Sequence, residues 1–465
     1  MNFDKDVRTH SHAYKLAHNQ SRIQCPCDRR KLQSSGKKRG KSTFLTAFST
    51  GMLAIGLLSS LFSVTACGVK SHQTVNADSA GPISKGDCSG AAISNRYIVR
   101  WKDGTTSIED VENAQDFNEN IAQPFADDIA FAETDFRIQI PKQPQHLRAE
   151  VFKGTPLNWG VSDSRANTAW AQGATGAGIL VAVVDTGVDE THPQLAGQLY
   201  VNPNEIPANQ LDDDSNGFVD DVNGYNFVTN TGHVTDGVGH GTHVSGIIAA
   251  DSSKGLVQGM APKAKILPLA FMDSDGGGTI SAAIRAITYA QAQGAKIVNA
   301  SWGGPQCSRA LNASISDLNA HGILFIAAAG NGDENGNGLD LGVSPEFPAA
   351  LGMPNQITVG AITIRDIIAG FSNYSRTLVN MVAPGVGIVS TFPGGGTASM
   401  DGTSMATPFV SGAAAAIWSA YPNATASQVR AALIGSTDFG DYPVTSGGRL
   451  DVVNALQLLK TFVQK

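Results

Sequence analysis

Apolar residues between positions 159 and 465 follow two alternating patterns. Largely apolar runs of strand length recur at residues 179–184, 265–270, 296–300, 323–328 and 357–360. Between them, apolar residues repeat at helical spacing, as at Ile280, Ala283, Ile284, Ile287 and Ala290, and residues 308–320 predict a further helix. Strands that are apolar on both faces and alternate with helices predict a mostly parallel sheet covered by helices on both sides. In such sheets, sites form at the carboxyl ends of the strands.

Residues 91–150 carry a weaker pattern, which predicts a small α+β unit. The pattern indicates a strand, a helix and a second strand, at residues 96–102, 108–117 and 136–140. Before this unit, residues 68–90 contain few large apolar side chains and predict a flexible spacer. After it, prolines and charged residues predict an exposed joint to the main domain at residues 155–465.

The first 67 residues form a leader of the kind that directs export. A basic cluster at residues 37–41 precedes an uncharged apolar run at residues 44–66. The run leads into Val-Thr-Ala-Cys at residues 64–67, which resembles the lipobox of bacterial lipoproteins, in which the cysteine is lipidated. The resemblance implies lipid attachment to a bacterial membrane through Cys67 at the cell envelope, or secretion after processing. An uncleaved membrane helix is the alternative, because about 20 apolar residues can span a bilayer.

The distribution of charge also separates the N-terminal leader from the rest of the chain. Residues 1–42 hold eleven Lys and Arg against three Asp, a net charge of +8, whereas the remainder has a net charge of −15. An acidic body argues against nucleic acid as a partner. The five cysteines form no metal-binding pattern of the C-x2-C type, and a pairing of Cys88 with Cys307 is left open.

Ser404 is the first candidate for catalysis. It lies in Gly-Thr-Ser-Met-Ala-Thr-Pro at residues 402–408, which opens an alanine-rich apolar run at residues 409–421 that predicts a buried helix. A serine at a helix N-terminus is either a cap or a nucleophile whose oxyanion faces the positive helix end. Asp185 follows a predicted strand and His240 precedes an apolar helix. Each has a structural interpretation by itself, but together they supply an orienting carboxylate and a base.

The blocks around Asp185, His240 and Ser404 occur in the order Asp, His, Ser, and residues 155–465 resemble the subtilisin-like serine proteases, or subtilases. The resemblance implies the three-layer subtilisin-like fold. It implies that Asp185 orients His240, and that His240 takes the proton of Ser404 and later gives it to the leaving amine. It also implies that Asn331, together with the backbone N–H of Ser404, stabilises the oxyanion.

The resemblance also indicates where a substrate binds. Residues 299–305 resemble the segment that pairs with an extended substrate and forms one wall of the S1 pocket, which implies roles for Ser301, Trp302, Gly303 and Gly304. Ala329 and Gly330 would form the opposite wall. Trp302 stands where many subtilases have leucine. No aspartate stands on either wall, so we expect an apolar or aromatic side chain at P1, the residue before the scissile bond.

An acidic segment at residues 212–221 has oxygen donors at alternate positions around a glycine, with Asp212, Asp214, Asn216 and Asp221 as candidate ligands. It is not an EF-hand loop, because position twelve is Asn223 rather than Glu. Similar loops occur in subtilases that bind structural Ca²⁺, which favours calcium over a solvated acidic turn. Residues 333–340 form a weaker candidate.

These features predict an exported serine endopeptidase that acts on protein or peptide substrates, works as a monomer and is made as a zymogen. Subtilases commonly carry a propeptide that assists folding and blocks the cleft, and residues 97–102 resemble its first strand. Residues 91–150 are therefore expected to act as an intramolecular inhibitor, with a plain spacer as the alternative. The rival class is a catalytically silent subtilase fold that serves as a surface binding protein.

Overall fold

The computed structural model describes residues 92–140 and 159–464, which belong to one compact unit of the chain. A nine-stranded sheet forms the centre, in the order β14-β15-β11-β10-β9-β8-β4-β6-β5, and its neighbouring strands are parallel except for β14 and β15. The strands are β4 (Leu180–Asp185), β5 (Tyr225–Asn226), β6 (Lys265–Ala270), β8 (Ile297–Ala300), β9 (Leu324–Ala328), β10 (Gln356–Ile362), β11 (Met381–Pro384), β14 (Asp438–Phe439) and β15 (Gly448–Arg449). The apolar runs therefore predicted β4, β6, β8, β9 and β10.

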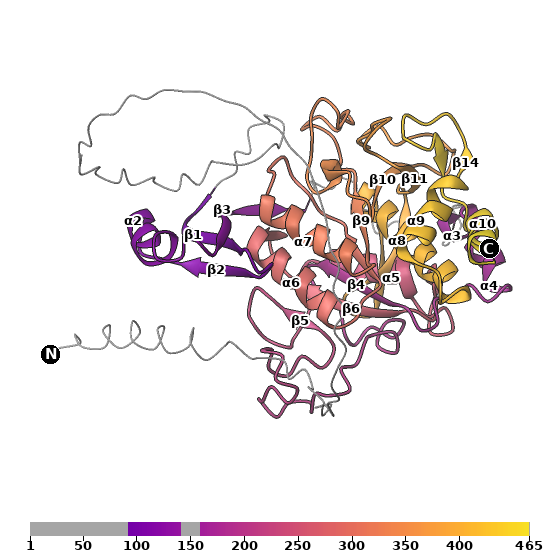
Figure 1. Cartoon of the computed structure of the whole chain (residues 1–465). Coiled ribbons are helices and arrows are strands. Elements are labelled where there is room, and N and C mark those ends of the chain that lie inside the picture. The colour runs from indigo at the N-terminus through magenta and orange to yellow at the C-terminus, as the bar shows by residue number, and fades with distance from the viewer. Residues whose placement is uncertain (1–91, 141–158, 465) are drawn as a thin grey trace, which may run out of the picture. The chain divides into compact units, whose positions relative to one another are not determined.

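Helices cover both faces of this sheet (Figure 1). They are α3 (Trp159–Asp163), α4 (Ala166–Trp170), α5 (His240–Ala249), α6 (Ile280–Ala292), α7 (Arg309–Ala320), α8 (Thr403–Ala420), α9 (Ala426–Gly435) and α10 (Val452–Val463). Val183 of β4 packs in one apolar cluster with α5 and α8, whereas Val184 packs in a second cluster with α6 and α7. Successive side chains of a strand point to opposite faces, so one strand serves both clusters. The predicted three-layer α/β architecture is confirmed.

Residues 92–140 supply three strands of a second, four-stranded antiparallel sheet, in the order β2-β1-β3-β7. The elements within residues 92–140 are β1 (Ala92–Trp101), β2 (Thr106–Asp110), α2 (Ala114–Phe117), a π-helical turn (Asn118–Ala122) and β3 (Ile129–Gln139). The prediction of a helix at residues 108–117 is wrong in its first half, because Ile108 pairs with Ile98 of β1. Gly104 has a φ of +90° and turns the chain back into a hairpin, and the helix begins only after Asn113 caps it.

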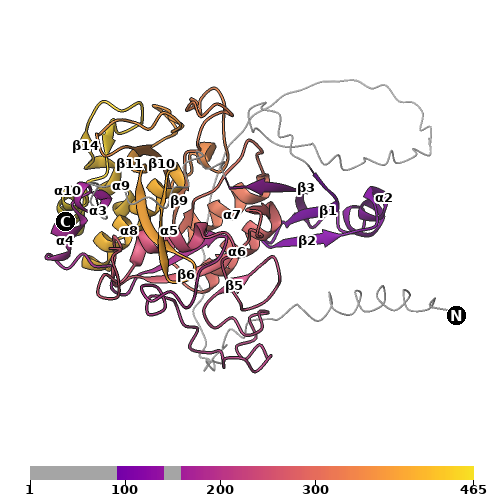
Figure 2. The same ribbon diagram turned by 180° about the vertical axis from the view of Figure 1, so that it is seen from behind.

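The end of β3 joins the main domain. It pairs antiparallel with β7 (Gly277–Thr279), with Ile138 opposite Gly278, and Gln139 bridges to Gly303. The last residues of β3 therefore run beside β7 and beside the segment that follows β8. Figure 2 shows the same arrangement from behind, with α6 and α7 next to β3. The remaining elements are η2 (Ala349–Leu351) and the hairpin of β12 (Ile388–Phe392) and β13 (Gly396–Met400).

Several sequence predictions fall outside the described residues: the leader at residues 1–67 with Cys67, the spacer at residues 68–90, Cys88, and the joint after residue 140. Within residues 92–140 and 159–464, no helix has the length and apolar character needed to cross a membrane. Cys307 is disulfide-bonded. Since it is the single cysteine of the two described ranges, its partner lies outside them.

Candidate active site

Ser404 is the second residue of α8 and is fully buried. The helix predicted from the run at residues 409–421 therefore begins earlier, at Thr403. Ser404 does not cap the helix. Gly402 occupies the N-cap position with a φ of 153°, and no side chain caps this end. The Ser404 hydroxyl instead donates a hydrogen bond to the carbonyl oxygen of Ser301 at 2.9 Å. Because the first backbone N–H groups of a helix have no helical acceptor, this end of α8 favours negative charge.

Pro408 strengthens the link between Ser404 and Ser301. A residue at position 408 would normally donate its backbone N–H to the carbonyl of Ser404, four residues earlier, but proline has no N–H. That carbonyl accepts a hydrogen bond from the Ser301 hydroxyl at 2.9 Å instead. The two serines therefore bond to each other reciprocally. The reciprocal bonds tie the start of α8 to the segment that follows β8.

Asp185 ends β4 and His240 begins α5, and the two side chains meet in the interior. His240 Nδ1 lies 2.7 Å from Asp185 Oδ1, and each side chain is at most 3% exposed. Gly239 precedes the helix with a φ of 93°. Gly241 allows the close approach of α5 to β4, because a Cβ there would lie 2.2 Å from the carbonyl oxygen of Gly187. His240 Nε2 is buried without a hydrogen-bond partner among the described residues.

Asp236 holds the backbone around the Asp185–His240 pair in place through hydrogen bonds. Its carboxylate accepts hydrogen bonds from the Thr186 hydroxyl at 2.8 Å and from the backbone N–H groups of Gly239 and Thr242 at 2.7 and 2.8 Å. Thr186 also accepts the backbone N–H of Gly241 at 2.9 Å. Asp236 therefore joins the residue after Asp185 to the first turn of α5. No sequence pattern singled it out, although an aspartate four residues before His240 in a glycine-rich run was visible.

The environment of His240 raises its pKa above the ordinary value. Burial alone would lower it, because burial disfavours the charged imidazolium. The charge of Asp185 and its hydrogen bond raise the pKa, and the charge of Asp236 raises it further. Together these effects outweigh burial. His243, in contrast, has a pKa of about 3 because burial dominates, and its Nε2 lies 3.1 Å from two carbonyl oxygens, those of Ile388 and Ala398. It is a neutral structural residue.

Asn331 has its amide oriented by Thr403. Its Oδ1 accepts the backbone N–H of Thr403 at 2.9 Å and the Thr403 hydroxyl at 2.8 Å. Both acceptor bonds are on the oxygen, so the NH₂ group is directed away from them. Asn331 Nδ2 is buried and makes no hydrogen bond to the described part of the chain. An unpaired buried donor is costly unless a ligand or water completes it.

The predicted substrate-binding residues lie on two segments that follow β8 and β9. Gly303 bridges to Gln139 of β3, so this segment already pairs with an extended strand. Trp302 does not stand at a surface: it is 1% exposed, donates its indole N–H to the carbonyl of Val184 at 2.8 Å and packs against Phe271. Ala329 is buried and Gly330 has a φ of 103°.

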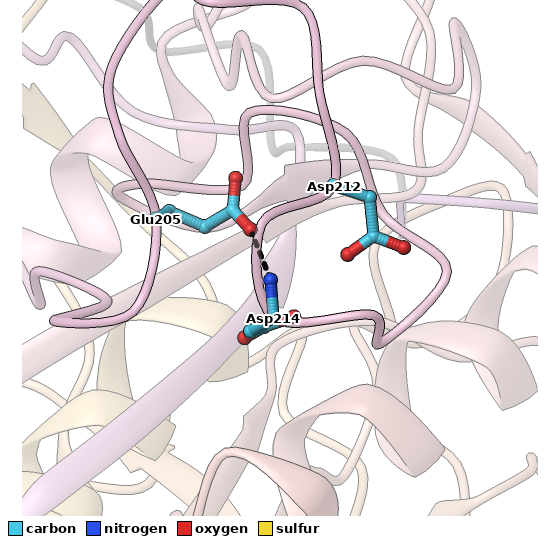
Figure 3. A group of neighbouring side chains, drawn as sticks. All are labelled: Glu205, Asp212 and Asp214. Carbon is cyan, nitrogen blue, oxygen red and sulfur yellow. Dashed lines mark hydrogen bonds between the residues drawn. The ribbon is translucent and has the colours of Figure 1, made fainter.

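The acidic loop brings three carboxylates together: those of Glu205, Asp212 and Asp214, whose ligand atoms lie within 4.8 Å of one another (Figure 3). Glu205 was missed in the sequence because it precedes the acidic run. Asp221 lies outside this group. Its carboxylate accepts hydrogen bonds from the side chains of Asn202, Asn216 and Tyr289.

The fold is a three-layer α/β architecture, and the candidate residues lie at or near the carboxyl ends of its parallel strands, as expected of a serine hydrolase built on such a sheet. The subtilase family profile matches residues 176–455, more than half of the chain, and the chain belongs to this family. Subtilisin DY from Bacillus licheniformis is 35% identical over 64% of this chain and 98% of its own length. Subtilisin NAT from Bacillus subtilis subsp. natto and subtilisin E from Bacillus subtilis (strain 168) are each 31% identical over 80% of this chain and 91% of their own lengths. The resemblance to subtilisin-like serine hydrolases is confirmed.

The raised pKa of His240 can be measured directly. We expect the His240 imidazole to titrate above pH 6.5, the value of an unperturbed histidine, in an NMR titration of the Ser404→Ala protein. Asp236→Asn removes a nearby negative charge and should lower the midpoint, whereas Asp441→Asn at an exposed position should leave it unchanged. A midpoint at or below 6.5, or one that Asp236→Asn does not move, would contradict this account.

Proposed function

We propose that this chain is a serine endopeptidase in which Asp185, His240 and Ser404 act as a catalytic triad on protein and peptide substrates. The observation that carries the proposal is the buried 2.7 Å contact between His240 and Asp185, which leaves Nε2 as the one nitrogen available to a reacting group. α5 and α8 pack against each other, so the base and the nucleophile begin neighbouring helices. Asp185 ends β4 and Asn331 lies three residues after β9, so both stand at carboxyl ends of the sheet, where sites form in parallel sheets.

In the proposed reaction, the Ser404 hydroxyl leaves Ser301 and turns to His240 Nε2 when a substrate binds. His240 takes the proton as Ser404 attacks the peptide carbonyl, and Asp185 stabilises the imidazolium. His240 then protonates the leaving amine, and water hydrolyses the acyl-enzyme by the same steps in reverse. Asn331 Nδ2 and the Ser404 backbone N–H stabilise the oxyanion, because both are preorganised donors in a water-poor site.

Two substitutions test these roles on a purified, processed enzyme. Ser404→Ala should abolish hydrolysis of peptide substrates and labelling by a fluorophosphonate. Asn331→Ala should lower kcat about 10²–10³-fold, the loss seen for the oxyanion-hole asparagine of subtilisin itself. Asn335→Ala, an exposed change in the same loop, is the matched control and should leave kcat unchanged. Equal activity of wild type and Ser404→Ala would refute the triad, and inactivity of the wild type would favour a silent binding protein.

The zymogen form is proposed from how residues 92–140 contact the main domain. Glu133 of β3 accepts hydrogen bonds from Ser308 and from the backbone N–H of Arg309 and Ala310, at the N-terminus of α7. Asp135 accepts the backbone N–H and hydroxyl of Ser281, at the N-terminus of α6. Carboxylates are favoured at helix N-termini. With the end of β3 paired to β7 and Gly303, residues 92–140 are suited to act as the intramolecular inhibitor.

Removing the two carboxylates should weaken this inhibition. In the full chain, Glu133→Gln together with Asp135→Asn should shorten the lag before peptide hydrolysis appears, by about 10-fold, because each helix-end contact contributes about 0.5–2 kcal/mol. Glu119→Gln, an exposed change on the same unit, should keep the wild-type lag. Cleavage is followed on reducing gels, because Cys307 is disulfide-bonded to a residue outside the described ranges. An unchanged lag in the double variant would leave residues 92–140 as a spacer.

Export is proposed from the leader. Mass spectrometry of the uncleaved Ser404→Ala protein tests it, because a chain that begins at a lipidated Cys67 reports both export and lipid attachment. An N-terminus at Met1 would contradict both. The monomeric state of the enzyme stays a prediction.

A structural Ca²⁺ ion is proposed at Glu205, Asp212 and Asp214, with Asn216 beside them. Glu205 Oε2 is buried and has no hydrogen-bond partner among the described residues, although its Oε1 accepts the backbone N–H of Asp213 at 2.9 Å. Burial raises the pKa of Glu205, hydrogen bonds from the backbone N–H groups of Asp213 and Asp214 lower it, and the charges of Asp221 and Asp213 raise it further. A hard cation with oxygen ligands would offset these like charges. In this arrangement Asp221 braces Asn216 at 2.8 Å rather than binding the ion itself.

Calcium removal should destabilise the protein. Chelation should lower the melting temperature of the Ser404→Ala protein, and either Glu205→Gln or Asp214→Ala should reduce that difference. Asp333→Ala in the second acidic segment is the matched control, because the Asp333 carboxylate is turned to backbone N–H groups of its own loop. A melting temperature that chelation does not change would refute the ion. A chelator effect that only Asp333→Ala removes would move the ion to the second segment.

A further inference from the structure

Glu346 lies between the two segments proposed to form the walls of the S1 pocket. Its neighbour Phe347 pairs with Gly304 through two backbone hydrogen bonds, from Gly304 N–H to the Phe347 carbonyl at 2.9 Å and from Phe347 N–H to the Gly304 carbonyl at 2.6 Å. This pairing fixes Glu346 beside the first wall.

The Glu346 carboxylate reaches the second wall. A Cβ placed on Gly330 would lie 2.0 Å from Glu346 Oε2 and 2.4 Å from Asn373 Nδ2. Gly330 also has a φ of 103°, a conformation that side chains rarely adopt. Glycine at position 330 therefore serves two purposes: it permits the backbone conformation and it leaves room for a carboxylate. Asn373 is held in turn by a 3.0 Å hydrogen bond from its Nδ2 to the carbonyl of Ala329.

The charge of Glu346 has no partner cation within the described part of the chain. Glu346 is partly buried, and no Lys or Arg within residues 92–140 and 159–464 forms an ion pair with it. Burial raises the pKa of Glu346, and the side chain of Asn373 lowers it. Asp163, another partly buried carboxylate of the main domain, is compensated differently, because it pairs with Arg449 at 2.8 Å. A partly buried carboxylate without a cation is costly, and a bound cation would offset that cost.

We infer that Glu346 forms the base of the S1 pocket and selects substrates with lysine or arginine at P1. The inference rests on the proposed function, which places the two walls around the P1 side chain. A long cationic side chain entering between the walls would pair with the Glu346 carboxylate, and arginine could do so with two parallel hydrogen bonds. An apolar or aromatic P1 side chain would desolvate the carboxylate without pairing it. The sequence predicted an apolar or aromatic P1 residue because no aspartate stands on either wall. Glu346 lies between the walls, and its carboxylate changes that prediction.

The test uses peptides that differ only at P1, with Lys, Arg, Gln, Met or Phe, and the purified, processed enzyme. The wild type should have its highest kcat/KM values with Lys and Arg. Glu346→Gln keeps the shape of the side chain but removes its charge. It should lower the Lys-to-Met ratio of kcat/KM at least about 30-fold, mainly through KM, while activity on Met and Phe is kept. Glu334→Gln, an exposed change in the same region, should keep the wild-type ratio. Benzamidine, a small cation, should inhibit the wild type more strongly than Glu346→Gln.

The outcomes separate this inference from the proposed function. A wild type that cleaves none of the peptides would refute the proposed function. A wild type that cleaves them but prefers Met or Phe to Lys would overturn the role of Glu346 alone. An unchanged ratio in Glu346→Gln would also overturn it. The concentration of active sites is measured by fluorophosphonate labelling. If the Glu346→Gln protein is not labelled, the role of Glu346 is judged from the wild type alone, by its Lys-to-Met ratio of kcat/KM and by its inhibition by benzamidine.

Discussion

The buried hydrogen bond between Asp185 and His240 is the interaction on which the geometry of the site depends. It joins the carboxyl end of strand β4 to the first residue of α5, and it forms where a charged imidazole would otherwise be costly. The pair needs support, because two buried polar groups keep one arrangement only when their neighbours are fixed. Asp236 gives that support by binding the backbone of the first turn of α5 and the hydroxyl of Thr186.

A second constraint links the start of α8 to the segment after β8. The absence of an N–H at Pro408 leaves the Ser404 carbonyl available to the Ser301 hydroxyl, and the Ser404 hydroxyl bonds back to the Ser301 carbonyl. The same segment continues to Gly303, which bridges to β3, and to Gly304, which pairs with Phe347. Ser404, the segment after β8 and the loop that carries Glu346 are thus linked by one series of hydrogen bonds. A displacement of any one of these three segments would therefore shift the other two.

The acidic side chains differ in whether donors of the protein itself compensate their charge. Glu133 and Asp135 face helix N-termini, where several N–H groups receive each carboxylate. Asp221 receives three side-chain donors. Glu205 and Glu346 differ, because the first has an unpaired buried oxygen and the second has an amide but no cation within the described ranges. The proposed Ca²⁺ ion and the proposed cationic P1 side chain would each supply a positive charge to one of these two carboxylates.

Local pattern in the sequence was sufficient for the parallel sheet and for the buried helix α8, predicted from the run at residues 409–421, because buried strands and helices leave their periods in the residues themselves. The triad of Asp185, His240 and Ser404 stays a prediction. Local pattern was insufficient at residues 108–117, where strand pairing with β1 overrode a helix-like run. Tertiary structure alone decided that Trp302 lies in the core, that Asp236 braces His240, and that Glu205 and Glu346 complete groups begun elsewhere in the chain. These roles depend on contacts between segments that are distant in the sequence. Whether a side chain is buried, and which charges surround it, is decided by those contacts and cannot be read from one stretch of sequence.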